Sequence, residues 1–307
     1  MGASTLPPSA APPVLAGVED SARLGIDQPP GWWPAVPRLK SYEAAGFRHL
    51  QVSIASRELL CDQRLLLTHA GALRESIRLT GLALIVHAPG ELMAGSPEHD
   101  AHLRGALRYA ALAGAEMLVY HGLRVPVDHP QLRRRLALEE HSLRRLTDVA
   151  GELGVRIAIE NLAPPYPGKK FVCHCPLAVA ELVRRLDHEQ VGICLDIGHA
   201  HVAAGYAGCA LLELIEPVLD RVILFHVHDN FGARPAAPRA GGIEPVRLDL
   251  HLAPGAGTVP WDLLAPVLSG HPAPLCLEIH PGKRPLPATL AIVMREVLGL
   301  GRGAKAI

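Results

Sequence analysis

The clearest chemical signal in the sequence lies in the stretch 222–257. An apolar run, VILF, passes directly into HVHDN, and DLHLAPGAG follows after a loop rich in Pro, Gly and Arg. Because side chains alternate along a strand, His226 and His228 would share one face. Two imidazoles at the tip of an apolar strand, with Asp249 and His251 nearby, are a donor set that divalent metal ions accept. Each histidine alone is more simply a hydrogen-bonded polar residue, so the interpretation depends on whether the pattern recurs.

A polar residue at the end of an apolar run does recur along the chain. In each run the residue two positions earlier is apolar or small, so the two would share a face. The polar residues are His87, His121, Glu160, Asp196, His226 and Glu278, and the earlier residues are Ile85, Val119, Ala158, Cys194, Leu224 and Cys276. Ionisable groups from so many strands meet without partners only at a large desolvation cost. A bound cation removes that cost, so the sequence predicts a metal centre, with His199, Asp249 and His251 on the adjoining loops.

The segments that carry these residues alternate with segments of helical periodicity. Near-continuous apolar strands separated by helices are typical of a parallel sheet buried on both faces. The predicted strands are 23–27, 49–54, 83–89, 117–122, 156–161, 191–199, 221–229 and 274–280, and the predicted helices are 34–45, 60–80, 97–113, 131–153, 177–187, 208–219, 261–269 and 286–298. Eight such units predict an α/β fold, a single-domain (β/α)8 TIM barrel. The polar residues would then lie at the carboxyl ends of the strands, where such barrels carry their active sites.

We place the barrel at residues 21–300. The Ala/Pro-rich segment 1–20 predicts a disordered tail, 301–307 a short second tail, and 231–247 a mobile loop over the barrel mouth. A doubly wound open sheet is the alternative fold, but no Gly-rich phosphate-binding sequence follows the first strand to support it.

Composition disfavours several classes of partner. Lys+Arg and Asp+Glu both number 30, which leaves no basic excess to attract nucleic acid or a membrane surface. No apolar run approaches the length of a membrane span, and the first twenty residues lack the basic and apolar regions of a signal peptide. The six cysteines do not form the dense framework of a secreted disulfide protein. We therefore expect a soluble, cytoplasmic protein with no membrane partner.

Several short sequences also stand in a familiar order. They are VHAP (86–89), VYHG (119–122), IEN (159–161), CLDIGHA (194–200), HVHD (226–229), DLHLAPGAG (249–257) and LEIHP (277–281). The chain resembles the xylose isomerase-like superfamily of TIM barrels, which unites sugar and sugar phosphate isomerases and epimerases with endonuclease IV. No single piece is specific, but the ordered set is, and it covers nearly everything after residue 20.

The resemblance to the isomerases and epimerases implies one divalent ion, which could be Mn, Zn, Mg or Co. Its ligands would be Glu160, Asp196, His226 and Glu278. Glu160 and Glu278 would also be catalytic, exchanging a proton with the substrate beside its carbonyl group. His199, His228 and Asn161 would contact the substrate. The implied function is a metal-dependent isomerase or epimerase of a small sugar or sugar phosphate, and a homo-oligomer is compatible with it.

The resemblance to endonuclease IV implies an alternative function with up to three metal ions. The further ligands would be His87, His121, His199, Asp249 and His251, and with the first four they make nine, all present. Such a multinuclear zinc phosphodiesterase would act on abasic DNA, and nucleic acid is a partner only under this alternative. The balanced charge and the lack of recognisable DNA-inserting loops favour the isomerase or epimerase.

The sequence departs from the family pattern at two places. Gln51 stands where such barrels often place a glutamate, so any substrate contact there would be uncharged. The arginine that epimerases carry shortly after the histidine of strand seven has no match at its usual spacing, and Arg234 and Arg247 are the candidates. No phosphate-binding sequence is evident, so a free sugar and a sugar phosphate stay equal alternatives.

Overall fold

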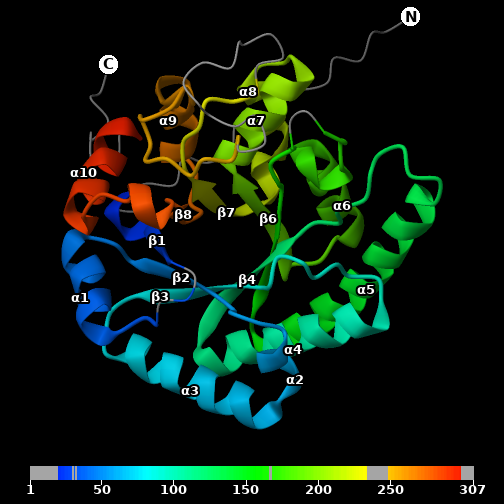
Figure 1. The fold of residues 1–307 in the computed structure, drawn as a ribbon, viewed down its shortest axis with the longest axis horizontal. Coiled ribbons are helices and arrows are strands. Elements are labelled where there is room, and N and C mark those ends of the chain that lie inside the picture. The colour runs from blue at the N-terminus through cyan, green and yellow to red at the C-terminus, as the bar shows by residue number, and fades with distance from the viewer. Residues whose placement is uncertain (1–19, 30, 32, 166–167, 234–247, 299–307) are drawn as a thin grey trace, which may run out of the picture.

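Eight parallel strands pair in sequence order and close into a barrel with helices around it (Figure 1). The strands are β1 (Leu24–Gln28), β2 (His49–Ser53), β3 (Ala83–His87), β4 (Ala115–His121), β5 (Arg156–Glu160), β6 (Val191–Asp196), β7 (Val222–Val227) and β8 (Leu275–Leu277). The computed structural model describes residues 20–29, 31, 33–165, 168–233 and 248–298. The single-domain (β/α)8 barrel predicted from the sequence is confirmed. The predicted tails and the loop at 231–247, with Arg234 and Arg247, lie wholly or mainly outside the described residues.

Helices follow the strands along the chain and cover the outside of the barrel (Figure 1). They are α1 (Val36–Ala45), α2 (Glu58–Cys61), α3 (Gln63–Arg78), α4 (Pro97–Ala113), α5 (Leu132–Leu153), α6 (Pro176–Leu186), α7 (Ile197–Ala207), α8 (Leu211–Ile215), α9 (Trp261–Ser269) and α10 (Pro287–Val297). Local chemistry sets several of their ends. The Ser96 hydroxyl accepts a hydrogen bond from the His99 backbone at 3.3 Å and begins α4, and Gly154 ends α5 at a φ of 67°. Both of these ends were predicted from the sequence.

The end of β6 is where the sequence prediction was wrong. A strand was expected to reach residue 199 and a helix to begin at 208, but β6 ends at Asp196 and α7 begins at the next residue. The Asp196 carboxylate accepts a hydrogen bond from the His199 backbone at 2.7 Å, so it is the N-cap of α7. The first half of α7 is buried and mostly apolar, which removes the alternating faces by which a helix is recognised in a sequence.

Two apolar layers form the core. The larger layer packs between the strands and the helices, and the smaller one fills the barrel interior. The interior layer contains Ile85, Met117, Val119, Ala158, Cys194, Leu224 and Cys276. Six of these seven are the residues predicted to lie two positions before the polar strand ends. The polar residues therefore lie on the same inward face, one layer nearer the barrel mouth.

Among the described residues, no single helix is long and apolar enough to cross a membrane. Two consecutive helical segments, Ile197–Ala207 and Leu211–Arg221, meet the length and composition criteria for a membrane span only when they are taken together. The chain bends by 114° between them.

Glu139 on α5 is a buried acid whose protonation is coupled to folding. It is 1% exposed, and its Oε1 accepts a hydrogen bond from the Tyr120 hydroxyl at 3.1 Å. Burial raises the pKa of Glu139 from 4.5 to about 7, although the Tyr120 hydrogen bond opposes the rise. The folded chain thus holds this proton more tightly than the unfolded chain. The resulting stabilisation is complete below pH 4.5 and is lost as the pH rises through about 7.

We expect Glu139→Gln to remove this loss, because an uncharged amide still accepts the Tyr120 hydrogen bond and has no proton to release. Between pH 5 and 7 the free energy of unfolding of the wild type should fall by roughly 2 kcal/mol more than that of the variant. Urea unfolding at several pH values measures both slopes. Parallel pH profiles for the two proteins would contradict the assignment.

Candidate metal centre

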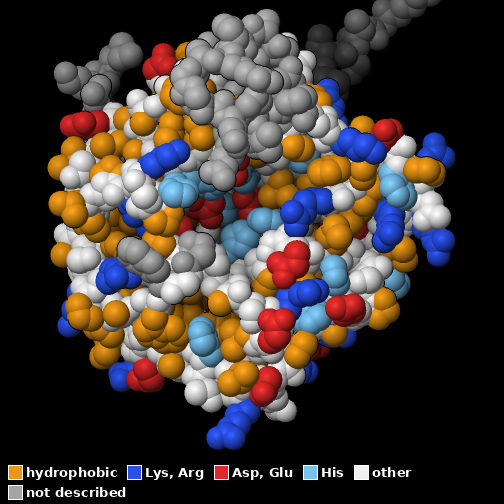
Figure 2. Space-filling view, viewed as in Figure 1, with side chains coloured by type: hydrophobic (Ala, Val, Ile, Leu, Met, Phe, Trp, Pro, Cys, Tyr) orange, Lys and Arg blue, Asp and Glu red, His pale blue; other side chains and the backbone are white. Residues whose placement is uncertain are grey.

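The polar residues predicted to meet at the barrel mouth do meet there. Figure 2 shows a hollow near the centre of this face, in which acidic and histidine side chains gather. A cavity of about 530 Å³ opens at this point, and His87, His121, Glu160, His199 and Glu278 are among the residues that line it. Strand register explains the convergence, because His121 of β4 pairs with Glu160 of β5 and Asp196 of β6 pairs with His226 of β7.

Four residues, called here the quartet, surround one point at the base of this hollow. The quartet is Glu160, Asp196, His226 and Glu278, and its ligand atoms all lie within 4.8 Å of one another. The Nδ1 atom of His226 lies 3.3 Å from Glu160 Oε1, 3.4 Å from Glu278 Oε1 and 3.9 Å from Asp196 Oδ2. Glu160, Asp196 and His226 are buried, whereas the Glu278 side chain is 14% exposed. The quartet thus offers three carboxylates and one imidazole, and Glu278 is its most exposed member.

Two further histidines share Glu160 with the quartet. His87 and His121, called here the histidine pair, each place Nε2 at 3.2 Å from Glu160 Oε2. The other oxygen of Glu160, Oε1, is the one that lies beside His226. Glu160 therefore joins two groups, with one carboxylate oxygen directed to each.

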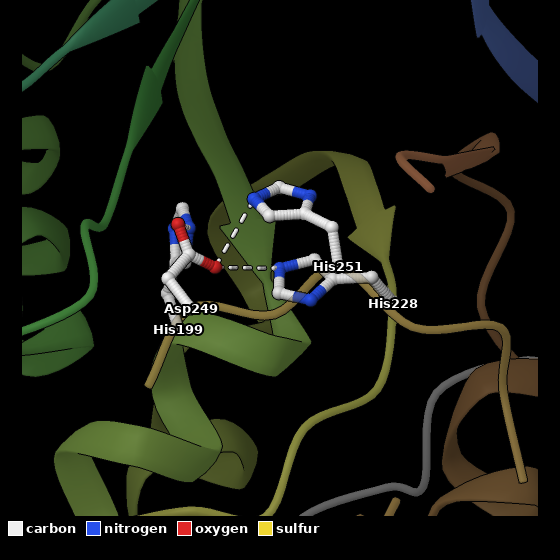
Figure 3. A group of neighbouring side chains, drawn as sticks. All are labelled: His199, His228, Asp249 and His251. Carbon is white, nitrogen blue, oxygen red and sulfur yellow. Dashed lines mark ion pairs between the residues drawn. The ribbon is translucent and has the colours of Figure 1, made fainter. Parts of the chain in front are cut away.

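A third group lies beside the quartet and is drawn in Figure 3. This group, called here the His251 group, consists of His199, His228, Asp249 and His251. Asp249 lies among the three rings: its Oδ1 is 3.0 Å from His251 Nε2 and 3.7 Å from His228 Nε2, and its Oδ2 is 3.4 Å from His199 Nε2. The rings of His228 and His251 stack at 3.9 Å. His228 Nε2 also lies 3.1 Å from Asp196 Oδ1, which connects this group to the quartet.

The loop that carries Asp249 and His251 is held over the mouth by Asp229. The fully buried Asp229 carboxylate accepts hydrogen bonds from the Asn230, Gly255 and Val259 backbones and from the Trp261 indole at 2.8 to 3.1 Å. His251 itself has a φ of 45°, a left-handed conformation that is unusual for a histidine. This strained backbone directs the His251 ring back into the mouth, where its Nδ1 bonds the Glu278 carbonyl at 2.7 Å.

Hydrogen bonds to the backbone set the tautomers of four of these histidines. In each ring Nδ1 lies beside a carbonyl oxygen and must donate its proton there, which leaves the Nε2 lone pair directed into the mouth. The contacts are His87 to Ala88 at 2.7 Å, His121 to Gly90 at 3.1 Å, His199 to Asn161 at 2.8 Å and His251 to Glu278 at 2.7 Å. Rings prepared in this way are typical of metal-ligating histidines.

The charged groups of the mouth hold one another in their ionised forms. Burial opposes ionisation of Glu160, but His226 and His121 nevertheless hold its pKa well below the usual range. Burial likewise opposes protonation of His226 and His251, yet the neighbouring carboxylates raise their pKa values to about 9 and about 10. In the absence of an ion, protons on the imidazoles balance the carboxylates. A divalent cation could replace those protons and balance the same charge.

An unpartnered buried oxygen shows that these residues fit a cation. Asp196 Oδ2 is buried without a hydrogen-bond partner among the described residues. A buried carboxylate oxygen in this state carries a desolvation cost that a metal ion would remove. Carboxylate oxygens and imidazole nitrogens are the ligands that Zn²⁺ and Mn²⁺ accept.

All nine ligands expected from the sequence fall into the three groups. Of the five further ligands implied by the resemblance to endonuclease IV, the structure places two in the histidine pair and three in the His251 group: His87 and His121 in the first, and His199, Asp249 and His251 in the second. Of the three residues expected to contact substrate, His199 lines the cavity. Asn161 and His228 are fully buried and do not line it. The Asn161 side chain instead bonds both the backbone N–H and the carbonyl of Asp196, at 2.9 and 3.0 Å.

Several cavity-lining residues were missed, and three of them are polar residues beside the predicted ligands. Asp27, Ser53 and Arg124 all face the mouth, and Asp27 is held by an ion pair with Arg284. Asp27 follows the apolar run of β1 just as Asp196 follows that of β6, so the same signal could have identified it. Arg124 lies in the loop after β4, where no periodic pattern indicates which way a side chain points.

A family model described as "Xylose isomerase-like TIM barrel" matches residues 39–296. The chain belongs to this family. The resemblance stated from the sequence motifs is therefore confirmed, and with it the barrel architecture.

The chain is also similar to individual proteins, in sequence or in fold. The uncharacterised protein MJ1311 of Methanocaldococcus jannaschii is 27% identical over 157 residues, which cover 48% of this chain and 52% of that protein. The chain spans about half the length of the curated relatives it matches, 52% and 47%. A crystal structure of D-psicose 3-epimerase in the presence of D-fructose superposes with a TM-score of 0.67 at 14% identity, covering 90% of this chain and 99% of that one. The IolI protein with a bound zinc atom superposes with a TM-score of 0.63 at 16% identity, covering 84% and 89%.

Proposed function

We propose that this protein is a divalent-metal-dependent isomerase or epimerase of a small sugar or sugar phosphate. The observation that supports this most directly is the placement of Glu160 and Glu278. These two carboxylates come from β5 and from the end of β8, have ligand atoms within 4.8 Å of each other, and both line the mouth cavity. A reaction that removes a proton from carbon and returns one needs two such groups beside a single substrate.

The two glutamates differ in how freely they reach the cavity. Glu278 Oε1 is engaged by Gln51 and lies near His226, whereas Oε2 lies 4.0 Å from His251 Nδ1. Glu278 Oε2 is therefore the carboxylate oxygen best placed to accept a proton from the carbon beside a substrate carbonyl. Glu160 lies on another side of the quartet and would return the proton. The roles would be reversed when the opposite epimer is the substrate.

The quartet would hold the ion, and the ion would polarise the substrate carbonyl and stabilise the negative charge that develops on its oxygen. His199 lines the cavity beside the quartet and would contact a substrate hydroxyl. Asn161 and His228 would act from beneath the cavity, because their buried side chains contact Asp196 rather than the open space. Similarity to D-psicose 3-epimerase and to zinc-bound IolI supports this proposal at the level of the fold.

The arrangement of the remaining ligands favours a second candidate, a multinuclear zinc phosphodiesterase acting on abasic DNA. The histidine pair contacts the quartet at Glu160 and the His251 group contacts it at Asp196, and each could hold a further ion. Clustered zinc ions of this kind activate a water molecule and stabilise the charge of a phosphodiester. The equal numbers of acidic and basic residues count against a strand-binding surface.

Solvent exchange distinguishes the two candidates. We expect the zinc- or manganese-loaded protein, incubated with a panel of ketoses in deuterated water, to place deuterium on the carbon beside the carbonyl, because the abstracted proton exchanges with solvent. Mass spectrometry of the recovered sugars measures the exchange. The same preparation should leave an oligonucleotide with one abasic site intact. Catalytic, salt-sensitive nicking of that oligonucleotide, with no exchange into any ketose, would overturn the proposal in favour of the phosphodiesterase.

A further inference from the structure

Gln51 lies directly beneath the quartet and contacts two of its members. It is on β2, is 1% exposed, and points into the barrel interior. Its side-chain amide donates a hydrogen bond to Glu278 Oε1, and its carbonyl Oε1 lies 2.8 Å from His226 Nε2. No residue of the quartet other than Glu278 and His226 makes a hydrogen bond with Gln51 among the described residues.

The chemistry of an amide determines what each of these contacts does. Only the NH₂ group can face the carboxylate of Glu278, because two oxygens placed together would repel. The amide oxygen must then face His226, so Nε2 of that ring must carry a proton and donate it to Gln51. In the neutral ring that would bind an ion, the His226 lone pair is consequently left on Nδ1, the atom that lies 3.3 to 3.9 Å from the three carboxylates of the quartet. One side chain therefore orients both a carboxylate and an imidazole towards the same point.

We infer that Gln51 is a positioning residue for the ion of the quartet, acting through His226 and Glu278. This inference rests on the proposed metal-dependent function. A glutamate at this position would still accept the proton of His226 but would place a second carboxylate against Glu278. Glutamine supplies the donor and the acceptor together, and at 1% exposure it has little room to exchange either contact for water. The uncharged residue where such barrels often place a glutamate thus supports the metal ligands rather than the substrate.

Zinc titration of the metal-free protein tests the inference, with Gln51→Met as the main variant. Methionine has nearly the same volume and makes neither hydrogen bond. Zinc binding to the quartet, which is the binding step that Asp196→Asn should abolish, should therefore weaken 10- to 100-fold. Gln51→Glu should weaken the same step less, because it keeps the contact with His226. Gln28→Met is the matched control, since Gln28 is a buried glutamine on the adjacent strand that contacts Tyr42, and it should bind zinc as the wild type does.

The absorption spectrum of the cobalt-loaded proteins separates positioning from a general effect on folding. At saturating cobalt, Gln51→Met should shift the visible bands, because the ligands are no longer held in one geometry, whereas Gln28→Met should leave them unchanged. Zinc affinity within twofold of wild type in Gln51→Met would overturn the inference. Weakened zinc binding in that variant with an unchanged cobalt spectrum would also overturn it, and so would an equal loss of zinc affinity in Gln28→Met. If Gln51→Met does not fold, the zinc titration and the cobalt spectrum are measured on Gln51→Glu and judged by the same criteria. A wild type that binds neither zinc nor manganese would refute the proposed function itself.

Discussion

Replacing Glu278 by Gln is expected to lower deuterium incorporation into the reactive ketose by roughly 100- to 10,000-fold, the usual contribution of one acid-base group. An amide cannot accept a proton from carbon, whereas its oxygen can still lie where the carboxylate oxygen lies. Glu160→Gln should lower exchange by a similar factor, because the reaction needs both a group that removes the proton and a group that returns it. Mass spectrometry of the recovered sugar measures both variants.

Zinc analysis of the same samples shows whether a variant has lost its base or its ion. Glu139→Gln is a matched control, because it makes the same chemical change at a buried glutamate outside the mouth and should leave exchange unchanged. Exchange at the wild-type rate in either Glu160→Gln or Glu278→Gln, with the ion still bound, would show that the glutamates do not transfer the proton.

The strand-end residues could be predicted from the sequence because the reasoning needs only local information. A polar residue that ends an apolar run, with a small or apolar residue two positions earlier, must point inwards at the carboxyl end of a barrel strand. Cys194 followed by Asp196, and Leu224 followed by His226, are two such cases, and both Cys194 and Leu224 lie in the interior layer. The closed barrel then brings these ends together, since the carboxyl ends of all eight strands meet at one mouth.

Which histidine lies beside which carboxylate could not be predicted, because loops decide it. Asp249 and His251 lie in no strand or helix, and their place over the mouth depends on the hydrogen bonds that Asp229 makes with residues up to 32 positions away. The left-handed backbone of His251 is a further local feature that no pattern of residue types indicates. Periodicity therefore predicted which residues meet at the mouth but not their division into three groups.

Gln51 was noticed only for its lack of charge. Its role depends on contacts with residues 175 and 227 positions away, which bring together strands on different sides of the barrel. The start of α7 was missed for a related reason. That helix is buried along its first half, and its N-cap, Asp196, had already been interpreted as part of a strand and as a metal ligand. Asp196 both caps α7 and belongs to the quartet, and the sequence pattern indicated only the second of these roles.

Asp196→Asn is expected to abolish the stabilisation that a bound ion gives to the fold. At a zinc concentration of 100 times Kd, the wild type should gain about 2.7 kcal/mol in its free energy of unfolding, and the variant should gain almost nothing. Asparagine still accepts the hydrogen bond from the His199 backbone, so α7 keeps its N-cap and the change falls on the quartet. Urea unfolding with and without zinc measures the gain in each protein.

Asp100→Asn is the matched control. Asp100 is a buried aspartate that accepts hydrogen bonds from the Ser142 hydroxyl and the Gly95 backbone. This variant should therefore be less stable than the wild type with or without zinc, yet it should keep the full gain in stability from zinc. An undiminished gain in Asp196→Asn would place the ion elsewhere.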